Sequence, residues 1–477
     1  MSPRLAELLA ALPEEESLEL VRGIPSPTEI TAAELSGVWT QPLPVHPLRR
    51  LWAMGGLQAQ IVFAYVAYWF RSFLGDTEAR QKQLAEANLR VALRTLRSMV
   101  YLRGAVMKIG QSLANFPDIV PNQFVETLDC LHFDAPPMHF ALLREQVRDE
   151  LGKDPEDIFD KFETRAFAAA SLGQVHRART RAGERVAVKI QYPAIAQTIE
   201  ADLRNLNALL FSLRLSPDWE YVRRQFEAVR RMLEQETDYG REAEFQRRAG
   251  SLFQSEDGIV IPRVLPEYST ARVLTMELLE GLNIHEFLAT RPSQEARDAA
   301  GEKMYRAAWR LYYAGLNYAD PHPGNYVFLL DGRLGLLDFG CVQAYSQEEI
   351  ELLRVAEVAA DGTPPPFREL ARRLGNLTEK ELASADLMGP MEELYHWILE
   401  PMKRPGPFDF SHEGHLRRGF GLMSQLVAKR YTRGHPLNLY LHRSFFGLRA
   451  MLYRLRARVD VLALRAQESQ SGWNQAS

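Results

Sequence analysis

Residues 318–342 read YADPHPGNYVFLLDGRLGLLDFGCV, and the middle of this stretch decides the local fold. Five mostly apolar residues, 326–330, precede Asp331-Gly332, and five more, 333–337, follow it. An Asp-Gly pair between two apolar runs is the strongest short-range signal for a β-hairpin with a two-residue turn. We therefore expect two antiparallel strands joined at this dipeptide.

The outer ends of this hairpin carry oxygen-bearing side chains. Folding at the Asp-Gly turn would place Asn325 opposite Asp338, with Asp320 on the loop that leads into the first strand. This group suits a hard cation such as Mg2+ when the cation also holds phosphate oxygens. A surface hairpin with polar ends is the alternative. However, the spacing from Asp320 to Asn325 and to Asp338-Phe339-Gly340 matches the catalytic loop and DFG element of protein kinases.

The same loop contains His322, between two prolines. Its role stays open between assisting phosphoryl chemistry and structural hydrogen bonding. Asp320 would position or deprotonate an attacking hydroxyl or water. Its role as a base is less firmly indicated than its place in the motif, because phosphoryl transfer needs little covalent chemistry from the protein.

The bulk composition limits the class of protein. A length of 477 residues allows two or three domains, or one two-lobed domain with extensions. The net charge of −4 gives no sign of nucleic-acid binding. Two cysteines, Cys130 and Cys341, are too few for a disulfide framework or a Cys-based metal site, which fits a reducing compartment. Acidic residues beside the short apolar run at the N-terminus argue against a signal peptide.

One apolar segment raises the question of membrane contact. Residues 51–70 are uncharged and are bounded by Arg50 and Arg71, a length that could span a bilayer. Gln58 and Gln60 weaken that interpretation. A spanning helix, a membrane-surface helix and a buried core helix all stay open, with a spanning helix the least favoured.

A helical extension is expected before the nucleotide-binding part. Apolar residues recur at helical spacing over 84–113, and amphipathic helices are also expected over 121–131 and 140–151. This pattern is unlike the start of an ordinary kinase.

A strand is expected over 185–191, after an Ala-Gly turn at 182–183. With period-two alternation, Ala187 and Lys189 would share one face of this strand. A lysine in a half-buried strand costs free energy unless an anion meets it. The sequence VAVK, residues 186–189, closely matches VAIK, whose lysine holds nucleotide phosphates and pairs with a helix glutamate. A lysine on an edge strand is the alternative.

The next segment, 194–250, is expected to be helical and carries the acidic candidates. Glu236 and Glu242 are six residues apart, so on one helix they would lie on separate faces and have different partners. We expect Glu242 to pair with Lys189, and Glu236 or Asp238 to meet another cation. A solvated charged helix is the alternative for each acid.

A strand over 272–278 is expected to lead into a hinge, whose residues Met276, Glu277 and Leu278 would contact the nucleotide. A helix over 294–316 would then deliver the catalytic loop.

The remaining chain, 347–460, is expected to be mostly helical, with proline-rich breaks at 364–366 and 401–407, and the tail from about Gln467 is expected to be disordered. The patterns divide the chain into an N-terminal segment, a helical extension, an N-lobe, a C-lobe and a tail. Their ranges are 1–83, 84–160, 161–280, 281–465 and 466–477.

Several motifs, in the right order over roughly residues 85–460, resemble those of the UbiB/AarF (ADCK-type) atypical protein-kinase-like family. They are KIGQ (108–111), FAAASLGQVH (167–176), ADPHPGN (319–325) and LLDFG (336–340). AVKIQYP (187–193) and ETDYGREAE (236–244) are most similar to the branch that contains the mitochondrial coenzyme Q accessory kinases. The resemblance implies an α+β, two-lobed protein-kinase-like fold with an N-terminal helical KxGQ extension.

The resemblance also implies how the nucleotide is held. The alanine-rich loop, with Ala168, Ala169, Ala170 and Ser171, would replace a glycine-rich loop and restrict the backbone around the triphosphate. In the family this loop is associated with altered nucleotide preference and suppressed self-phosphorylation. Lys189 would hold the phosphates.

The KxGQ helix of the family folds across the active site, where a protein substrate would bind. Carried over, Lys108 would meet Glu236 or Asp238 near the nucleotide, and Gln111 lies on the same helix.

The implied activity is Mg2+-dependent binding of ATP or ADP with slow ATP hydrolysis, in support of isoprenoid-quinone (ubiquinone-type) biosynthesis at a membrane. The expected partners are an isoprenoid-quinone precursor or phenolic lipid, a membrane surface and quinone-biosynthesis proteins, without nucleic acid. The expected location is cytoplasmic and peripheral to a membrane. A true protein or small-molecule kinase and a nucleotide-gated pseudokinase or lipid-binding scaffold are the competing functions.

Overall fold

The computed structural model describes residues 140–170, 172–193, 195–197, 199–200, 203–204, 223, 227, 230–231, 233–358, 367–373, 377–428 and 436–470. Of these residues, those up to Thr237 and those from Glu267 to Thr275 form one compact unit, and the others form a second. The helices predicted over 84–113 and 121–131 and the apolar segment 51–70 lie outside the described residues. Within the described part, no helix is both long and apolar enough to cross a membrane.

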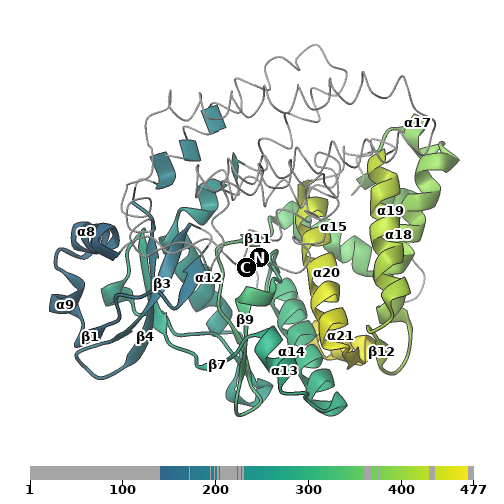
Figure 1. Ribbon diagram of the computed structural model, residues 1–477. Coiled ribbons are helices and arrows are strands. Elements are labelled where there is room, and N and C mark those ends of the chain that lie inside the picture. Colours follow the sequence, from purple (N-terminus) through teal and green to yellow (C-terminus); the bar gives the residue numbers. More distant parts are fainter. Residues whose placement is uncertain are drawn as a thin grey trace, which may run out of the picture. The chain divides into compact units, whose positions relative to one another are not determined.

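The first unit is built on a sheet whose strands are labelled in Figure 1. They are β1 (Lys161–Phe162), β2 (Ala168–Ala170), β3 (Gly173–Arg179), β4 (Arg185–Gln191) and β6 (Val273–Glu277). The order is β1-β3-β4-β6, and β2 pairs with β3. β6 carries the chain out of the first unit, because its last two residues belong to the second.

The strand predicted over 185–191 is confirmed, but it is more deeply buried than expected. Every residue of β4 after Arg185 is buried, on both faces, whereas the sequence suggested a half-buried strand. The strands β3 and β6 cover its two edges, and packing of other elements against the sheet accounts for the burial of its faces. The helix α8 (Phe140–Leu151), which has the predicted bounds, also packs against β4.

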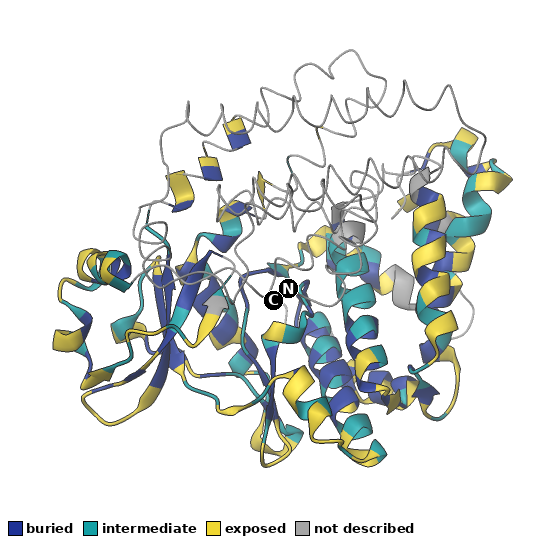
Figure 2. Ribbon diagram, in the orientation of Figure 1, coloured by how far each residue is buried: buried dark blue, intermediate teal, exposed yellow. Residues whose placement is uncertain are grey.

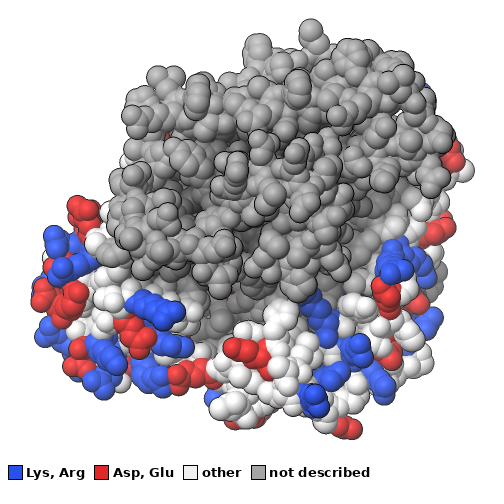
Figure 3. All heavy atoms as spheres, viewed as in Figure 1, with Lys and Arg blue, Asp and Glu red and all other residues white. Residues whose placement is uncertain are grey.

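The surface of the first unit carries charges of both signs. After α8 comes the short helix α9 (Pro155–Ile158). At this junction Arg144 and Arg148 both pair with Asp154, at 3.0 and 2.7 Å. Figure 3 shows acidic and basic side chains intermingled on the described surface. Such exposed pairs add little to stability.

The second unit opens with α12 (Tyr239–Gly250), which is capped by the side chain of Asp238. Because Asp238 has extended backbone angles, the continuous helix predicted over 194–250 is wrong at this point. The angular argument that placed Glu236 and Glu242 on separate faces of one helix therefore does not apply.

Short strands and longer helices make up the rest of the second unit. The helices are α13 (Ile284–Ala289), α14 (Gln294–Tyr313), α15 (Gln347–Val358), α16 (Phe367–Arg373), α17 (Glu379–Leu382), α18 (Ala385–Lys403), α19 (Glu413–Ala428), α20 (Pro436–Leu455) and α21 (Val461–Ser469). The strands are β5 (Ile259–Val260), β7 (Gly281–Leu282), β8 (Leu316–Tyr318), β9 (Tyr326–Leu329), β10 (Leu334–Leu336), β11 (Val342–Ala344), β12 (Phe408–Asp409) and β13 (Arg458–Val459). The single-turn 3-10 helices are η3 (Ser255–Asp257) and η5 (Pro323–Asn325), while η4 (Pro266–Tyr268) begins in this unit and continues into the first. β5, β10, β9 and β7 form one sheet in that order, and β8 pairs with β11.

The β9–β10 hairpin forms where the sequence predicted it, but its turn has one residue more than expected. The connection is 330–332, and Gly332 has a φ of +84°, which is the geometry of a type I turn followed by a left-handed residue. This extra residue shifts the register by one. Leu337, whose N–H donates to the carbonyl of Asn325 at 3.0 Å, therefore lies opposite Asn325 in place of Asp338.

The core of the second unit surrounds α14. Met304, Tyr305 and Leu311 on this helix are buried, and α20 and α21 pack against it. Figure 2 shows the buried, dark blue faces of these helices. The helix predicted over 294–316 ends three residues early, because Gly315 has a φ of +77° and turns the chain into β8.

Two further expectations need correction at the C-terminal end. α18 continues through Pro401 to Lys403, so the predicted break at 401–407 begins at Arg404. The break predicted at 364–366 lies outside the described residues. The tail is not disordered from Gln467, because α21 continues to Ser469.

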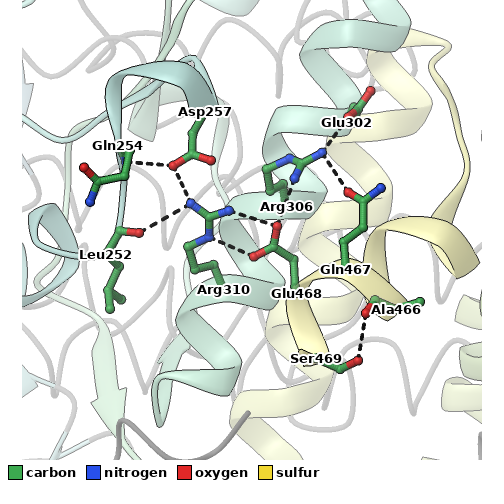
Figure 4. A network of polar contacts seen from close by, with 10 residues as sticks. All are labelled: Leu252, Gln254, Asp257, Glu302, Arg306, Arg310, Ala466, Gln467, Glu468 and Ser469. Carbon is green, nitrogen blue, oxygen red and sulfur yellow. Dashed lines mark hydrogen bonds and ion pairs between the residues drawn. The ribbon is translucent and has the colours of Figure 1, made fainter. Parts of the chain in front are cut away.

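A buried ion network holds α21 in place (Figure 4). The side chain of Glu468, 3% exposed, accepts hydrogen bonds from Arg306 at 3.0 Å and from Arg310 at 2.8 and 3.0 Å. Arg310 also pairs with Asp257. Burial alone would lower the pKa of Arg310, but its bonds to Glu468 and Asp257 raise that pKa. Glu468 is thus the residue that orders the chain where the sequence suggested a loose tail.

We predict that Glu468→Gln lowers the free energy of unfolding by about 3 kcal/mol, because it leaves two partly buried guanidinium groups with too little negative charge. Urea unfolding of the full chain measures this. The matched control is Glu302→Gln, which removes an exposed partner of Arg306 on the same helix and should cost about 0.5 kcal/mol or less. Equal losses in the two variants would contradict the role of the buried network.

Candidate functional site

Small side chains surround a buried lysine on one face of the first unit's sheet. Lys189, in β4, is 6% exposed. Val175 of β3 lies opposite Lys189, and Ala168 of β2 lies opposite Val175. Directly opposed residues of antiparallel strands point to the same side, so Ala168 shares the face of Lys189, as does Ala187 two positions earlier. This face therefore carries a buried cation beside the small side chains of Ala168 and Ala187.

The segment predicted as an alanine-rich loop is a strand in the structure. β2 pairs with β3, and the register sets Ala170 opposite Gly173. Ala170 thus belongs to the same face as Lys189. The loop prediction is wrong for these alanines because the connection to β3 is tight enough for them to pair as a hairpin. Ser171 lies outside the described residues.

In the second unit, two carboxylates approach the backbone of one glycine. A Cβ on Gly340 would lie 3.3 Å from Asp338 Oδ1 and 3.5 Å from Glu242 Oε2. The Gly340 N–H donates to Asp338 Oδ1 at 2.9 Å. Glu242 is only 2% exposed. Lys189 belongs to the first unit and Glu242 to the second. The pairing of these two residues therefore stays a prediction.

Arg241 ties α12 to the strand that follows the DFG element. Its Nη2 donates to the carbonyl of Val342 at 3.0 Å, and its guanidinium lies 4.7 Å from the ring centre of Phe245. Burial lowers the pKa of Arg241. The sequence reasoning did not single out this residue, because its partner is 101 positions away.

Side chains of the predicted catalytic loop, residues 320–325, form hydrogen bonds within the loop itself. Asn325 Nδ2 donates to the backbone carbonyl of Asp320 at 2.8 Å and lies 3.4 Å from its carboxylate. His322 Nδ1 accepts from the Gly324 N–H at 3.2 Å, which favours the structural role that the sequence left open. The loop thus presents Asp320 and Asn325 together.

Two buried tyrosines lie at the ends of this loop. Burial raises the pKa of the Tyr318 hydroxyl and that of the Tyr326 hydroxyl, so both phenols stay neutral near neutral pH.

The side chain of Asp320 keeps 36% of its surface exposed. Asp320 is therefore a partly exposed carboxylate on the predicted catalytic loop.

The predicted metal ligands Asn325 and Asp338 are not direct cross-strand partners, because Leu337 lies opposite Asn325, so their sharing of one Mg2+ stays a prediction. Asn325 uses its nitrogen toward Asp320, which leaves its Oδ1 as a metal-binding atom, and Asp338 offers carboxylate oxygens. The structure contains no group of three or more His, Cys, Asp or Glu residues that could hold a metal within its described part. A cation held by these two residues would have to take its other ligands from phosphate and water.

The predicted hinge residues lie at and after the end of β6. Met276 is buried, and its sulfur lies 3.6 Å from Gln246 Nε2. The Glu277 N–H donates to the carbonyl of Arg263 at 2.8 Å, so a nucleotide contact at Glu277 would have to use its carbonyl. Leu278 is half-buried.

The structure places only two of the four residues expected around the KxGQ helix. Glu236 is buried, and Asp238 is exposed and caps α12. Lys108 and Gln111 lie outside the described residues. Their contacts with the two acids stay predictions.

Comparisons with known proteins show to which family and fold this chain is similar. Residues 130–360 match the model of the ABC1 atypical kinase-like domain. The chain is 30% identical over 426 residues to a mitochondrial atypical kinase of Rattus norvegicus, COQ8B, covering 87% of this chain and 79% of the rat protein. It is 29% identical over 386 residues to the mitochondrial atypical kinase coq-8 of Caenorhabditis elegans, covering 79% of this chain but half of the worm protein.

A solved structure is also similar, that of Rv3197 from Mycobacterium tuberculosis in complex with erythromycin. The TM-score is 0.55 at 26% identity, over 84% of this chain and all of that one. Together these matches confirm the predicted kinase-like α+β fold and the family resemblance.

We predict that Gly340→Ala weakens Mg2+-dependent binding of ADP at least about tenfold, since crowding a packed site by one methyl costs about 1–3 kcal/mol. Asp338 cannot yield without losing its bond to the Gly340 N–H. Calorimetric titration with ADP and Mg2+ measures the change. Gly421→Ala is the control, since its Cβ would meet nothing within 4 Å. Unchanged affinity in Gly340→Ala would refute the crowding.

Proposed function

This chain belongs to the ABC1 atypical kinase-like family, and from that membership we propose that it binds ATP or ADP with Mg2+ and slowly hydrolyses ATP. The observation that carries this proposal is the buried Lys189 on a sheet face of alanines. A buried ammonium group is stable only with negative charge close by. Lys189 already has an interaction within the protein, and nucleotide phosphates would add negative charge on this face, where Ala168, Ala170 and Ala187 have small side chains.

The roles of the other residues follow from their geometry. Glu242, buried on α12, would orient Lys189. Asn325 and Asp338 would hold Mg2+. When bound, the metal would offset the negative charge of the phosphate oxygens. Asp320 would position the attacking water or hydroxyl, because it is the exposed carboxylate of the loop. Met276, Glu277 and Leu278 would contact the base of the bound nucleotide.

The predicted N-terminal residues would limit the reaction. Lys108 and Gln111 on the KxGQ helix would exclude a protein substrate, with Lys108 meeting Glu236 or Asp238. Water, or a small acceptor, would then be the phosphate acceptor. This accounts for an atypical kinase or ATPase and disfavours a true protein kinase.

The biological role that we propose is support of isoprenoid-quinone biosynthesis at a membrane surface. Similar proteins are named mitochondrial atypical kinases of the COQ8 type, which supports this assignment. A quinone precursor or phenolic lipid, and quinone-biosynthesis proteins, would be the partners. The segment 51–70 would provide the membrane contact.

We predict that the wild type shows Mg2+-dependent ATP turnover that rises with anionic liposomes, and that Asp338→Asn and Lys189→Gln lose it. Asp331→Asn and Lys161→Gln are matched controls, because both positions are exposed, and they should retain turnover. Phosphate release and thermal stabilisation by ADP with Mg2+ are the measurements.

The outcomes separate the competing functions. Stabilisation by the nucleotide without turnover would favour a nucleotide-gated scaffold. Stable phospho-product that requires an added acceptor would favour a true kinase. If the wild type shows no turnover and no stabilisation by the nucleotide, nucleotide binding is refuted.

A further inference from the structure

A helix far along the sequence contacts the catalytic loop. Arg443 on α20 lies with its Nη2 3.3 Å from Asp320 Oδ1 and is only 14% exposed. The hydroxyl of the next residue, Ser444, lies within hydrogen-bond distance of Asn317 Oδ1, at 2.5 Å, and of the Tyr318 carbonyl, at 3.0 Å. The contacted residues immediately precede or include the predicted catalytic aspartate.

One turn further along α20, a glycine allows the loop to approach. A Cβ on Gly447 would lie 2.5 Å from Cγ and 3.1 Å from Cδ of Pro321. Residues 443, 444 and 447 are spaced so that they share one face of the helix. This face, the loop-contact face of α20, thus touches the catalytic loop through charge, hydrogen bonding and close packing.

A cavity lies next to the loop, so the loop has fewer packing contacts there. The contacts from α20 therefore matter more for holding the loop in position. The cavity of about 50 Å³ is lined by Asn317, Tyr318 and Pro321 from the loop side and by Ser444 from α20, among others. Side chains that border a cavity lose part of their packing attraction on that side. The loop-contact face therefore restrains Asp320 from outside the loop, in addition to the contact of Asp320 with Asn325 within the loop.

The loop has no cation of its own. Residues 317–326 contain neither lysine nor arginine. The guanidinium of Arg443 supplies positive charge next to the Asp320 carboxylate from outside the loop. A planar guanidinium fixes the direction of a carboxylate better than a lysine does.

We propose that α20 positions the catalytic loop and that Arg443 is the positioning residue for Asp320. Its effect on the reaction rests on the proposed function, because it acts through the residue that would orient the nucleophile. Misplacing such a group by about 1 Å can cost about 100-fold in rate. Since Arg443 is not placed among the nucleotide-holding residues, nucleotide affinity should be spared.

The test uses the full chain with Arg443→Ala, Arg443→Lys and Gly447→Ala. We expect Arg443→Ala to lower kcat for ATP turnover about 10- to 100-fold while KM and the affinity for ADP with Mg2+ change less than about threefold. Arg443→Lys should recover part of kcat, which a merely structural role would not require. Arg454→Ala, an exposed arginine on the same helix, is the control and should match the wild type. Unchanged kcat in Arg443→Ala, or an equal loss of affinity, would overturn the proposal.

A second measurement does not depend on turnover. Amide hydrogen exchange over residues 317–325 should speed up in Arg443→Ala and Gly447→Ala but not in Arg454→Ala. If the wild type hydrolyses no ATP, the proposed hydrolysis fails, and exchange alone then decides whether α20 restrains the loop. Unchanged protection in both variants would overturn the restraint, whatever the activity.

Discussion

A buried charge must meet an opposite charge or several hydrogen bonds, and this constraint recurs at each important point of the molecule. Glu468 meets Arg306 and Arg310, which orders the C-terminal helix. Lys189 is buried in a sheet, and Glu242 is buried on a helix of the other unit. The network around Glu468 is structural. Lys189 and Glu242 are the two opposite charges that the proposed nucleotide site would use.

The proposed site draws on elements that are far apart in sequence. The second unit brings Glu242, Asp338 and Gly340 to one point, and it brings Asp320 to Asn325 and Arg443. The first unit contributes a lysine with alanines beside it. Each group would have a distinct physical role, which is to neutralise phosphate charge, to bind a hard cation or to orient a nucleophile. The proposed function therefore rests on family membership, and these local geometries support it.

Local patterns predicted much of the fold. The helix over 140–151 and the strand over 185–191 follow from apolar periodicity, and the hairpin near Asp331 follows from its turn residues. The register of that hairpin was wrong by one residue, because the Asp-Gly signal does not separate a two-residue turn from a three-residue turn with glycine in the last position.

The remaining errors came from contacts that no local pattern contains. The chain around Gln467 looked like a loose tail because its anchors, Arg306 and Arg310, are some 160 residues earlier. Arg443 and Arg241 went unnoticed for the same reason, since each meets its partner more than 100 residues away. The motif residues Asp320, Asn325 and Asp338 were identifiable because their spacing, not only their environment, is characteristic.

A crystal structure of the full chain with ADP and Mn2+ would test the central claim most directly. We expect anomalous signal from Mn2+ at Asp338 and Asn325, with Lys189 Nζ within about 4 Å of both the Glu242 carboxylate and a phosphate oxygen. A metal bound elsewhere, or Lys189 and Glu242 held by separate partners with the nucleotide off the alanine face, would contradict it.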